Sequence, residues 1–175
     1  MRDVIEPIQS PREVTERHAA IGLWVRRGIM CVLAAVVVVA LCNVVGQRAS
    51  TARAHTQLGA LSLRAPTVVR PGLLFQAKIS ITAFEPMPAT QLVLGNGWVD
   101  GLTINTIEPA ASSETSAPDG GLVFDLGTID RGQTFVEYLE FQVNPTSISR
   151  RDQTVTVRSQ GAVVAALHRT MTIIP

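Results

Sequence analysis

The chain has 175 residues, a hydrophobic fraction of 46% and a formal net charge of +1, from fifteen Lys and Arg against fourteen Asp and Glu. This near balance excludes a protein that binds nucleic acid through a strongly basic surface. The length allows one membrane span and one small domain with its own hydrophobic core.

Residues 1–27 carry charges of both signs and are expected to form a cytoplasmic tail with a juxtamembrane helix. Ser10 suits the N-cap position, Pro11 the first helical position, and Glu13 the third position of a capping box. The pattern therefore predicts a helix that begins at about Pro11 and runs on toward the apolar segment that follows.

Residues 28–46, GIMCVLAAVVVVALCNVVG, contain no charged side chain. As a helix they extend about 28 Å, close to the thickness of the hydrocarbon core of a bilayer. We predict a transmembrane helix in contact with membrane lipid, with Trp24, Arg26 and Arg27 at the membrane interface. Arginines are more frequent just before this segment than after it, which favours a cytoplasmic N-terminus and an extracytoplasmic C-terminal domain in the cell membrane.

Two alternatives concern this segment. Ala52-Arg53-Ala54 resembles a signal-peptidase site, but the charged and apolar regions are both long for a removable signal, so a retained anchor is favoured. The two cysteines, Cys31 and Cys42, lie within the segment, eleven residues apart, which is about 16 Å along a helix and too far for a disulfide between them. They are interpreted as small apolar side chains, with an interchain disulfide or an acylation site as the alternative.

Residues 47–60 are polar and small and are expected to form a stalk, and residues 61–175 are expected to form a β-domain. Two stretches alternate between apolar and polar side chains, as half-buried strands do. In Leu73–Phe84 the inward side chains are Phe75, Ala77, Ile79, Ile81 and Ala83. In Phe135–Val143 they are Phe135, Leu139, Phe141 and Val143, and Glu137 is expected on the same face, at the rim or paired.

Shorter strands are predicted between turns rich in Gly, Pro, Asn and Asp. They are Leu61–Ala65, Thr67–Arg70, Gln91–Leu94, Trp98–Val99, Leu102–Ile107, Leu122–Leu126, Gln153–Arg158 and Val163–Ile174. The prolines of Glu85–Pro88 are expected to end a strand, and Pro109–Gly121 to form a long loop. Seven to nine short strands without a helical pattern indicate an antiparallel β-sandwich.

Two motifs resemble the immunoglobulin-like modules of prokaryotic surface proteins, of the DUF11, CARDB and NEW3 types. They are Val69-Arg70-Pro71-Gly72 and the stretch from Phe124 to Thr134, FDLGTIDRGQT, each of which precedes a long strand. The resemblance covers about residues 62–175 and departs from the pattern at Glu85–Pro88. It implies a bacterial protein with an immunoglobulin-like fold, and it carries no catalytic residues.

No motif for catalysis, a metal or a cofactor occurs, so the chain is not expected to be an enzyme and no cofactor is expected. Asp119, Asp125 and Asp130 match no compact calcium loop and are interpreted as solvated turn residues, with a calcium site as the alternative. His168 is expected to be a surface residue of the last strand.

Three residues are candidates for contact with a partner. Trp98 is expected in the core or at its rim, with an exposed interface position as the alternative. Arg150, Arg151 and Asp152 are expected to form a charged turn, with contact between the arginines and a phosphate or an acidic partner as the alternative.

The sequence therefore predicts a non-enzymatic, membrane-anchored interaction or accessory module. It presents an exported β-sandwich to a protein partner in the membrane or envelope, and one form of this role is that of a subunit of a membrane complex. The alternative is a surface module for carbohydrate or cell-wall polymer, which the small number of aromatic residues disfavours.

Overall fold

The computed structural model describes residues 11–41 and 47–175, which belong to two separate units, 1–45 and 46–175. In the first unit, α1 (Pro11–Leu41) confirms the helix predicted from Pro11. Its stretch Gly22–Leu41 is long and apolar enough to cross a membrane, and none of the side chains along it is buried within the protein. The predicted N-cap Ser10 and the end of the predicted span, residues 42–46 with Cys42, lie outside the described residues.

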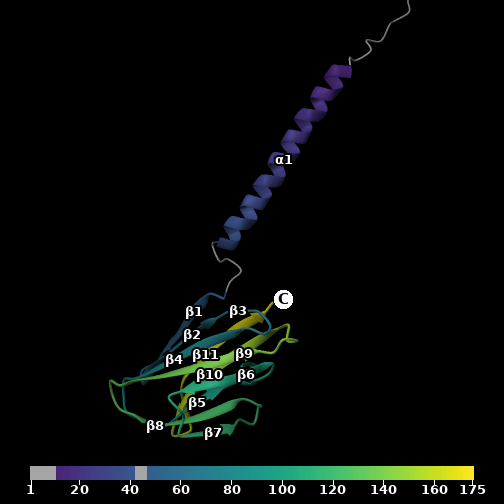
Figure 1. The fold of residues 1–175 in the computed structure, drawn as a ribbon. Helices are drawn as coiled ribbons and strands as arrows, with labels where there is room; N and C mark the ends of the chain where they lie inside the picture. The colour runs from purple at the N-terminus through teal and green to yellow at the C-terminus, as the bar shows by residue number, and fades with distance from the viewer. Residues whose placement is uncertain (1–10, 42–46) are drawn as a thin grey trace, which may run out of the picture. The chain divides into compact units, whose positions relative to one another are not determined.

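The second unit is a sandwich of two β-sheets, which Figure 1 shows as two layers. One sheet has the order β1-β2-β4-β9-β6, formed by Ala49–His55, Gly59–Pro66, Leu74–Ala83, Thr134–Val143 and Leu102–Glu108. The other has the order β3-β11-β10-β5-β8-β7, formed by Val68–Val69, Ala162–Ile173, Ser149–Ser159, Met87–Leu94, Leu122–Ile129 and Ser113–Ser116. Neighbouring strands are antiparallel except for β3 and β11. The predicted β-sandwich with one N-terminal helix is confirmed, and its strands are antiparallel apart from this one pair.

The core fills the space between the sheets and confirms the alternation predicted for β4 and β9. All five predicted inward side chains of β4 are buried, as are Leu139, Phe141 and Val143 of β9, and Phe135 packs half-buried against them. Aromatic contacts link the centre of this core. The Phe141 ring centroid lies 5.2 Å from that of Phe75 and 5.2 Å from that of Trp98.

Arg169 of β11 joins the two sheets at one edge. Its guanidinium donates hydrogen bonds to the carbonyl oxygens of Ala65, at 3.0 Å, and of Pro66, both at the end of β2. Burial lowers the pKa of Arg169 from its usual value. These bonds hold the end of β2 in place, and the Ala65 carbonyl also accepts a hydrogen bond from the Ser50 hydroxyl at 3.5 Å.

Four predicted elements were wrong. Residues 49–55 form the edge strand β1, paired with β2 over its whole length, so they are not a stalk. The predicted loop 109–121 contains the strand β7. The predicted strand 98–99 is replaced by the short 3-10 helix η1 (Asn96–Trp98). The predicted turn 150–152 lies within strand β10.

The segment 87–90 shows how a strand accommodates proline. The strand β5 begins at Met87, not at Gln91, and its register with β8 shifts beside Thr90. Ala89 takes a positive φ of 47°, while the Thr90 hydroxyl donates to the Met87 carbonyl at 2.6 Å. The bulge lets the chain pass Pro88, which has no N–H for the ladder, and continue as a strand.

Candidate functional site

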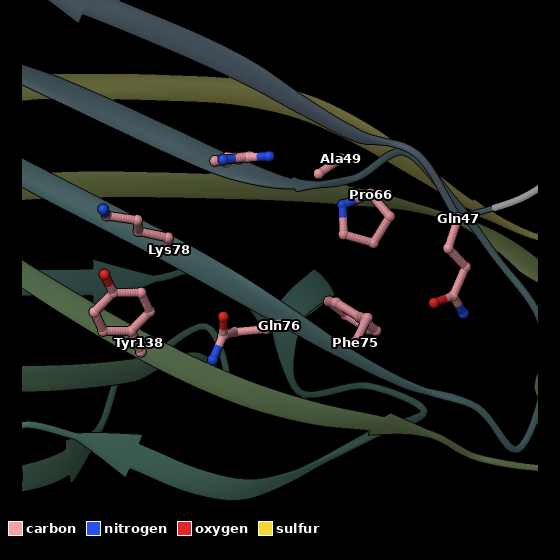
Figure 2. Close-up of a pocket in the computed structure, with 8 residues that line it drawn as sticks. Gln47, Ala49, Pro66, Phe75, Gln76, Lys78 and Tyr138 are labelled. Atoms are coloured by element: carbon pink, nitrogen blue, oxygen red, sulfur yellow. The ribbon is translucent and has the colours of Figure 1, made fainter.

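A hollow of about 450 Å³ opens on the outer face of the five-stranded sheet (Figure 2). We call it the Arg64/Lys78 hollow. Its lining residues are Gln47, Ala49, Arg64, Pro66, Phe75, Gln76, Lys78 and Tyr138. They come from β1, β2, β4 and β9 and from the residue Gln47 that precedes β1. Strand pairing therefore brings together side chains from distant parts of the chain.

The register of the strands places the charged side chains in one row. Arg64 of β2 lies opposite Lys78 of β4, and Lys78 lies opposite Tyr138 of β9. Side chains directly opposite in antiparallel strands point to the same face, with Cβ atoms about 5 Å apart. The Lys78 ammonium lies 5.3 Å from the centroid of the Tyr138 ring, a cation–π distance that orients the ammonium over the ring.

The hollow is rich in donors and contains no carboxylate among its lining residues. Among the residues that the structure describes, ion pairs join Arg131 to Glu85 and Arg151 to Asp100, and neither includes Arg64 or Lys78. The side-chain nitrogen of Gln47 is buried and has no hydrogen-bond partner. The site therefore carries two positive charges and an unsatisfied N–H group.

A second hollow, of about 460 Å³, contains the two arginines predicted as partner contacts. Its charged lining residues are Asp100, Asp119, Arg150, Arg151, Asp152 and Arg158. Arg151 donates to the Asp100 carboxylate and its side chain is only 22% exposed. Arg150 is exposed. Positive and negative side chains alternate around this second hollow, and Arg151 forms an ion pair with Asp100 of the same domain.

Trp98 is not a partner contact. Its side chain is 0% exposed, and it packs on Phe141 in the core. The predicted alternative of an exposed interface tryptophan is therefore wrong. At the residues predicted to lie at a membrane interface, Trp24 is 69% exposed and the Arg27 guanidinium lies 5.6 Å from the Trp24 ring centroid.

Glu137 occupies the inner face of β9, opposite Ile79, as predicted. The prediction that it lies at the rim or in a pair was wrong. Its side chain is 0% exposed, and both carboxylate oxygens are buried without a hydrogen-bond partner. Desolvation raises the pKa of Glu137 from 4.5 to about 7. The alternation of β9 placed this residue on the core face, but no sequence signal showed how deeply it is buried.

Two of the three aspartates in the middle of the domain accept hydrogen bonds from backbone N–H groups. Asp119 accepts a hydrogen bond from the Gly121 N–H at 3.1 Å, and Asp125 accepts one from the Gly127 N–H at 3.0 Å. Within residues 11–41 and 47–175, no three His, Cys, Asp or Glu side chains are close enough to hold a metal ion. The contact of Asp119 supports its interpretation as a turn residue, whereas Asp125 lies within strand β8, so its interpretation as a turn residue was wrong.

No family model and no curated protein matches the sequence. Solved structures resemble the fold at low identity. A cohesin module of a Clostridium perfringens family 33 glycoside hydrolase has 16% identity and a TM-score of 0.46, over 67% of this chain and 98% of that one. A CARDB domain from Pyrococcus furiosus, in complex with di-metal ions, has 12% identity and a TM-score of 0.43, over 72% and 89%. AvmM, which catalyses macrocyclization in alchivemycin A biosynthesis, has 8% identity and a TM-score of 0.45, over 74% and 90%.

Proposed function

We propose that the chain is a single-pass membrane protein that presents a non-enzymatic β-sandwich to a protein partner on the extracytoplasmic side of the cell membrane. The observation that carries this proposal is the helix stretch Gly22–Leu41, whose apolar side chains are exposed along its whole length. Soluble proteins rarely leave so large an apolar surface in water, whereas a bilayer buries it.

The residues at the start of this stretch support the same proposal. Trp24 is exposed beside the cationic Arg27, an arrangement that suits the boundary between lipid tails and headgroups. Arg26 and Arg27 precede the apolar residues and favour retention of that end in the cytoplasm. The β-sandwich, which has a core of its own, then occupies the opposite side.

Extraction of membranes with alkaline carbonate tests the anchor. We expect the full chain to stay in the pellet and its mature form to retain residues 1–54. The matched control replaces Val37 and Val38 with arginine, which makes the centre of the helix costly to insert. Release of the wild-type chain by carbonate, or a mature N-terminus near His55, would refute the anchor.

The partner contact is assigned to Arg150, because it is exposed whereas Arg151 is held by Asp100. A photo-crosslinking amino acid at position 150 is expected to capture one membrane protein in living cells. The same group at position 131 serves as the control, because Arg131 lies in the exposed turn between β8 and β9. Equal capture from both positions, or retention of the domain on cell-wall polymer without a protein adduct, would contradict the assignment.

A further inference from the structure

We propose that the Arg64/Lys78 hollow binds the phosphate of an anionic phospholipid headgroup. This rests on the proposed membrane anchor, because the anchor places the lipid within reach. The site is distinct from the surface of Arg150, which lies on the other sheet.

The charge of the hollow indicates an anion. Arg64 and Lys78 lie directly opposite each other on β2 and β4, and like charges in that position destabilise a sheet. None of the lining residues is acidic, so the hollow itself supplies no counterion. A bound phosphate would neutralise the repulsion. An arginine guanidinium matches two phosphate oxygens with parallel N–H groups, and a lysine ammonium adds a compact point charge.

A neighbouring ring positions one of the two cations. The buried Gln47 nitrogen, which lacks a hydrogen-bond partner, lies towards the other end of the hollow, because Arg64 pairs with Thr51, four residues further along the chain. The Tyr138 ring holds the Lys78 ammonium at 5.3 Å, and the Pro66 carbonyl is already occupied by Arg169. Figure 2 shows Lys78 beside Tyr138 and Gln76, and Gln47 at the other end of the hollow. The volume of about 450 Å³ falls within the range of small-molecule sites.

Chain connectivity identifies the source of the phosphate. Gln47 lies six residues beyond Leu41, where α1 ends. Six residues of fully extended chain span at most about 22 Å. The length of the intervening chain therefore limits the distance between Leu41 and Gln47 to about 22 Å, and under the proposed anchor headgroup phosphates are the most concentrated anions at the end of the apolar helix. The second hollow alternates Arg with Asp and is less suited to an anion.

Thermal unfolding of the full chain in an uncharged detergent tests this site. A ligand that binds only the folded state raises Tm, and the rise grows with the logarithm of its concentration once this exceeds Kd. We expect dihexanoyl-phosphatidylglycerol to raise Tm by several degrees, and dihexanoyl-phosphatidylcholine and inorganic phosphate to raise it much less at the same concentrations. An equal rise with phosphatidylcholine, or with inorganic phosphate, would refute an anionic lipid headgroup as the ligand.

Three variants locate the effect. Arg64→Gln and Lys78→Gln are expected to abolish the rise in Tm, whereas Arg131→Gln, which removes the same charge from an exposed turn, is expected to retain it. Arg64→Lys keeps the charge without the two parallel N–H groups, and it is expected to retain part of the rise even if Arg64→Gln fails to fold. An unchanged rise in both glutamine variants would place binding elsewhere. The measurement does not depend on membrane insertion, so failure of the anchor in carbonate extraction is a separate result.

Discussion

The Glu137 carboxyl makes the stability of the sandwich depend on pH. Its pKa is about 7 in the folded state against 4.5 for an ordinary glutamate, so the folded protein keeps this proton where the unfolded chain has released it. The free energy of unfolding is expected to fall by about 3 kcal/mol as pH rises from about 4.5 to about 7. Above about pH 7 it stays at this lower value, because the carboxyl group is then ionised in both the folded and the unfolded state. Urea unfolding of the fragment 47–175 across this range measures the effect.

The variant Glu137→Met isolates this contribution, because it fills a similar volume without a charge. We expect it to remove this part of the pH dependence and to be more stable than the wild type at about pH 8. Glu140→Met is the control, because Glu140 lies on the outer face of the same strand, three residues away. Parallel pH profiles for the wild type and Glu137→Met would contradict the prediction.

Gly97 is required by a close approach between η1 and β10. A Cβ atom at this position would lie 2.0 Å from the Asp152 carbonyl oxygen, which belongs to the backbone and cannot rotate away. Gly97→Ala is therefore expected to lower the free energy of unfolding by about 1–3 kcal/mol. The exposed neighbour provides the control, since Asn96→Ala is expected to change it by no more than about 0.5 kcal/mol. Chemical denaturation of both variants measures the difference, and equal stabilities would refute the steric argument.

At individual residues, the sequence predicted the face of a strand better than the environment of a side chain. Alternation placed Glu137 on the inner face, but its lack of a partner depends on side chains from other strands. Trp98 is buried because Phe141, far along the chain, packs against it. The Arg64/Lys78 hollow was missed for the same reason. The only sequence signal for this hollow was the polar face predicted for β4. That Lys78 lies opposite Arg64 depends on the register between β4 and β2, which the sequence alone did not show.

The edge strand β1 is part of the domain and not a spacer before it. Its seven residues pair with β2, and Ala52 and Ala54 pack against the core. A fragment that begins at residue 57 is therefore expected to unfold at lower urea concentration than one that begins at residue 49, with a loss on the order of 1–3 kcal/mol. A stalk would give two fragments of equal stability, which is the outcome that would contradict this role.

Among the elements, long strands with regular alternation were predicted from the sequence and short polar strands were not. The strands β4 and β9 bury every second side chain, so their pattern is strong. The strand β7 is exposed at all four residues, and β1 contributes only small side chains to the core. Both β7 and β1 are defined by hydrogen bonds to a neighbouring strand, and such bonds leave no apolar pattern in the sequence. The bulge at Pro88 was missed because proline usually ends a strand, whereas here a left-handed Ala89 lets the strand continue.

For the whole molecule, composition and turn spacing were sufficient for the fold class but not for the order of the strands. A sandwich follows from many short strands without helical periodicity. The order β1-β2-β4-β9-β6 depends on which hydrophobic faces fit together across the core, and this information is spread over the whole chain. The apolar helix was evident from the sequence because it depends on local composition alone.

The orientation of the chain in the membrane is a prediction for the whole molecule. With Cys31 and Cys42 replaced by alanine, Ser116→Cys places a single thiol on the exposed strand β7, and Thr15→Cys places one in the tail. In wall-stripped, intact cells, a membrane-impermeant maleimide is expected to label position 116 at once, and position 15 only after permeabilisation. The reason is that Arg26 and Arg27 lie next to the apolar segment and resist translocation, whereas a long domain is translocated largely regardless of its charge. Labelling of position 15 but not of position 116 in intact cells would reverse the orientation, and it would also remove the partner contact at Arg150 from the cell surface.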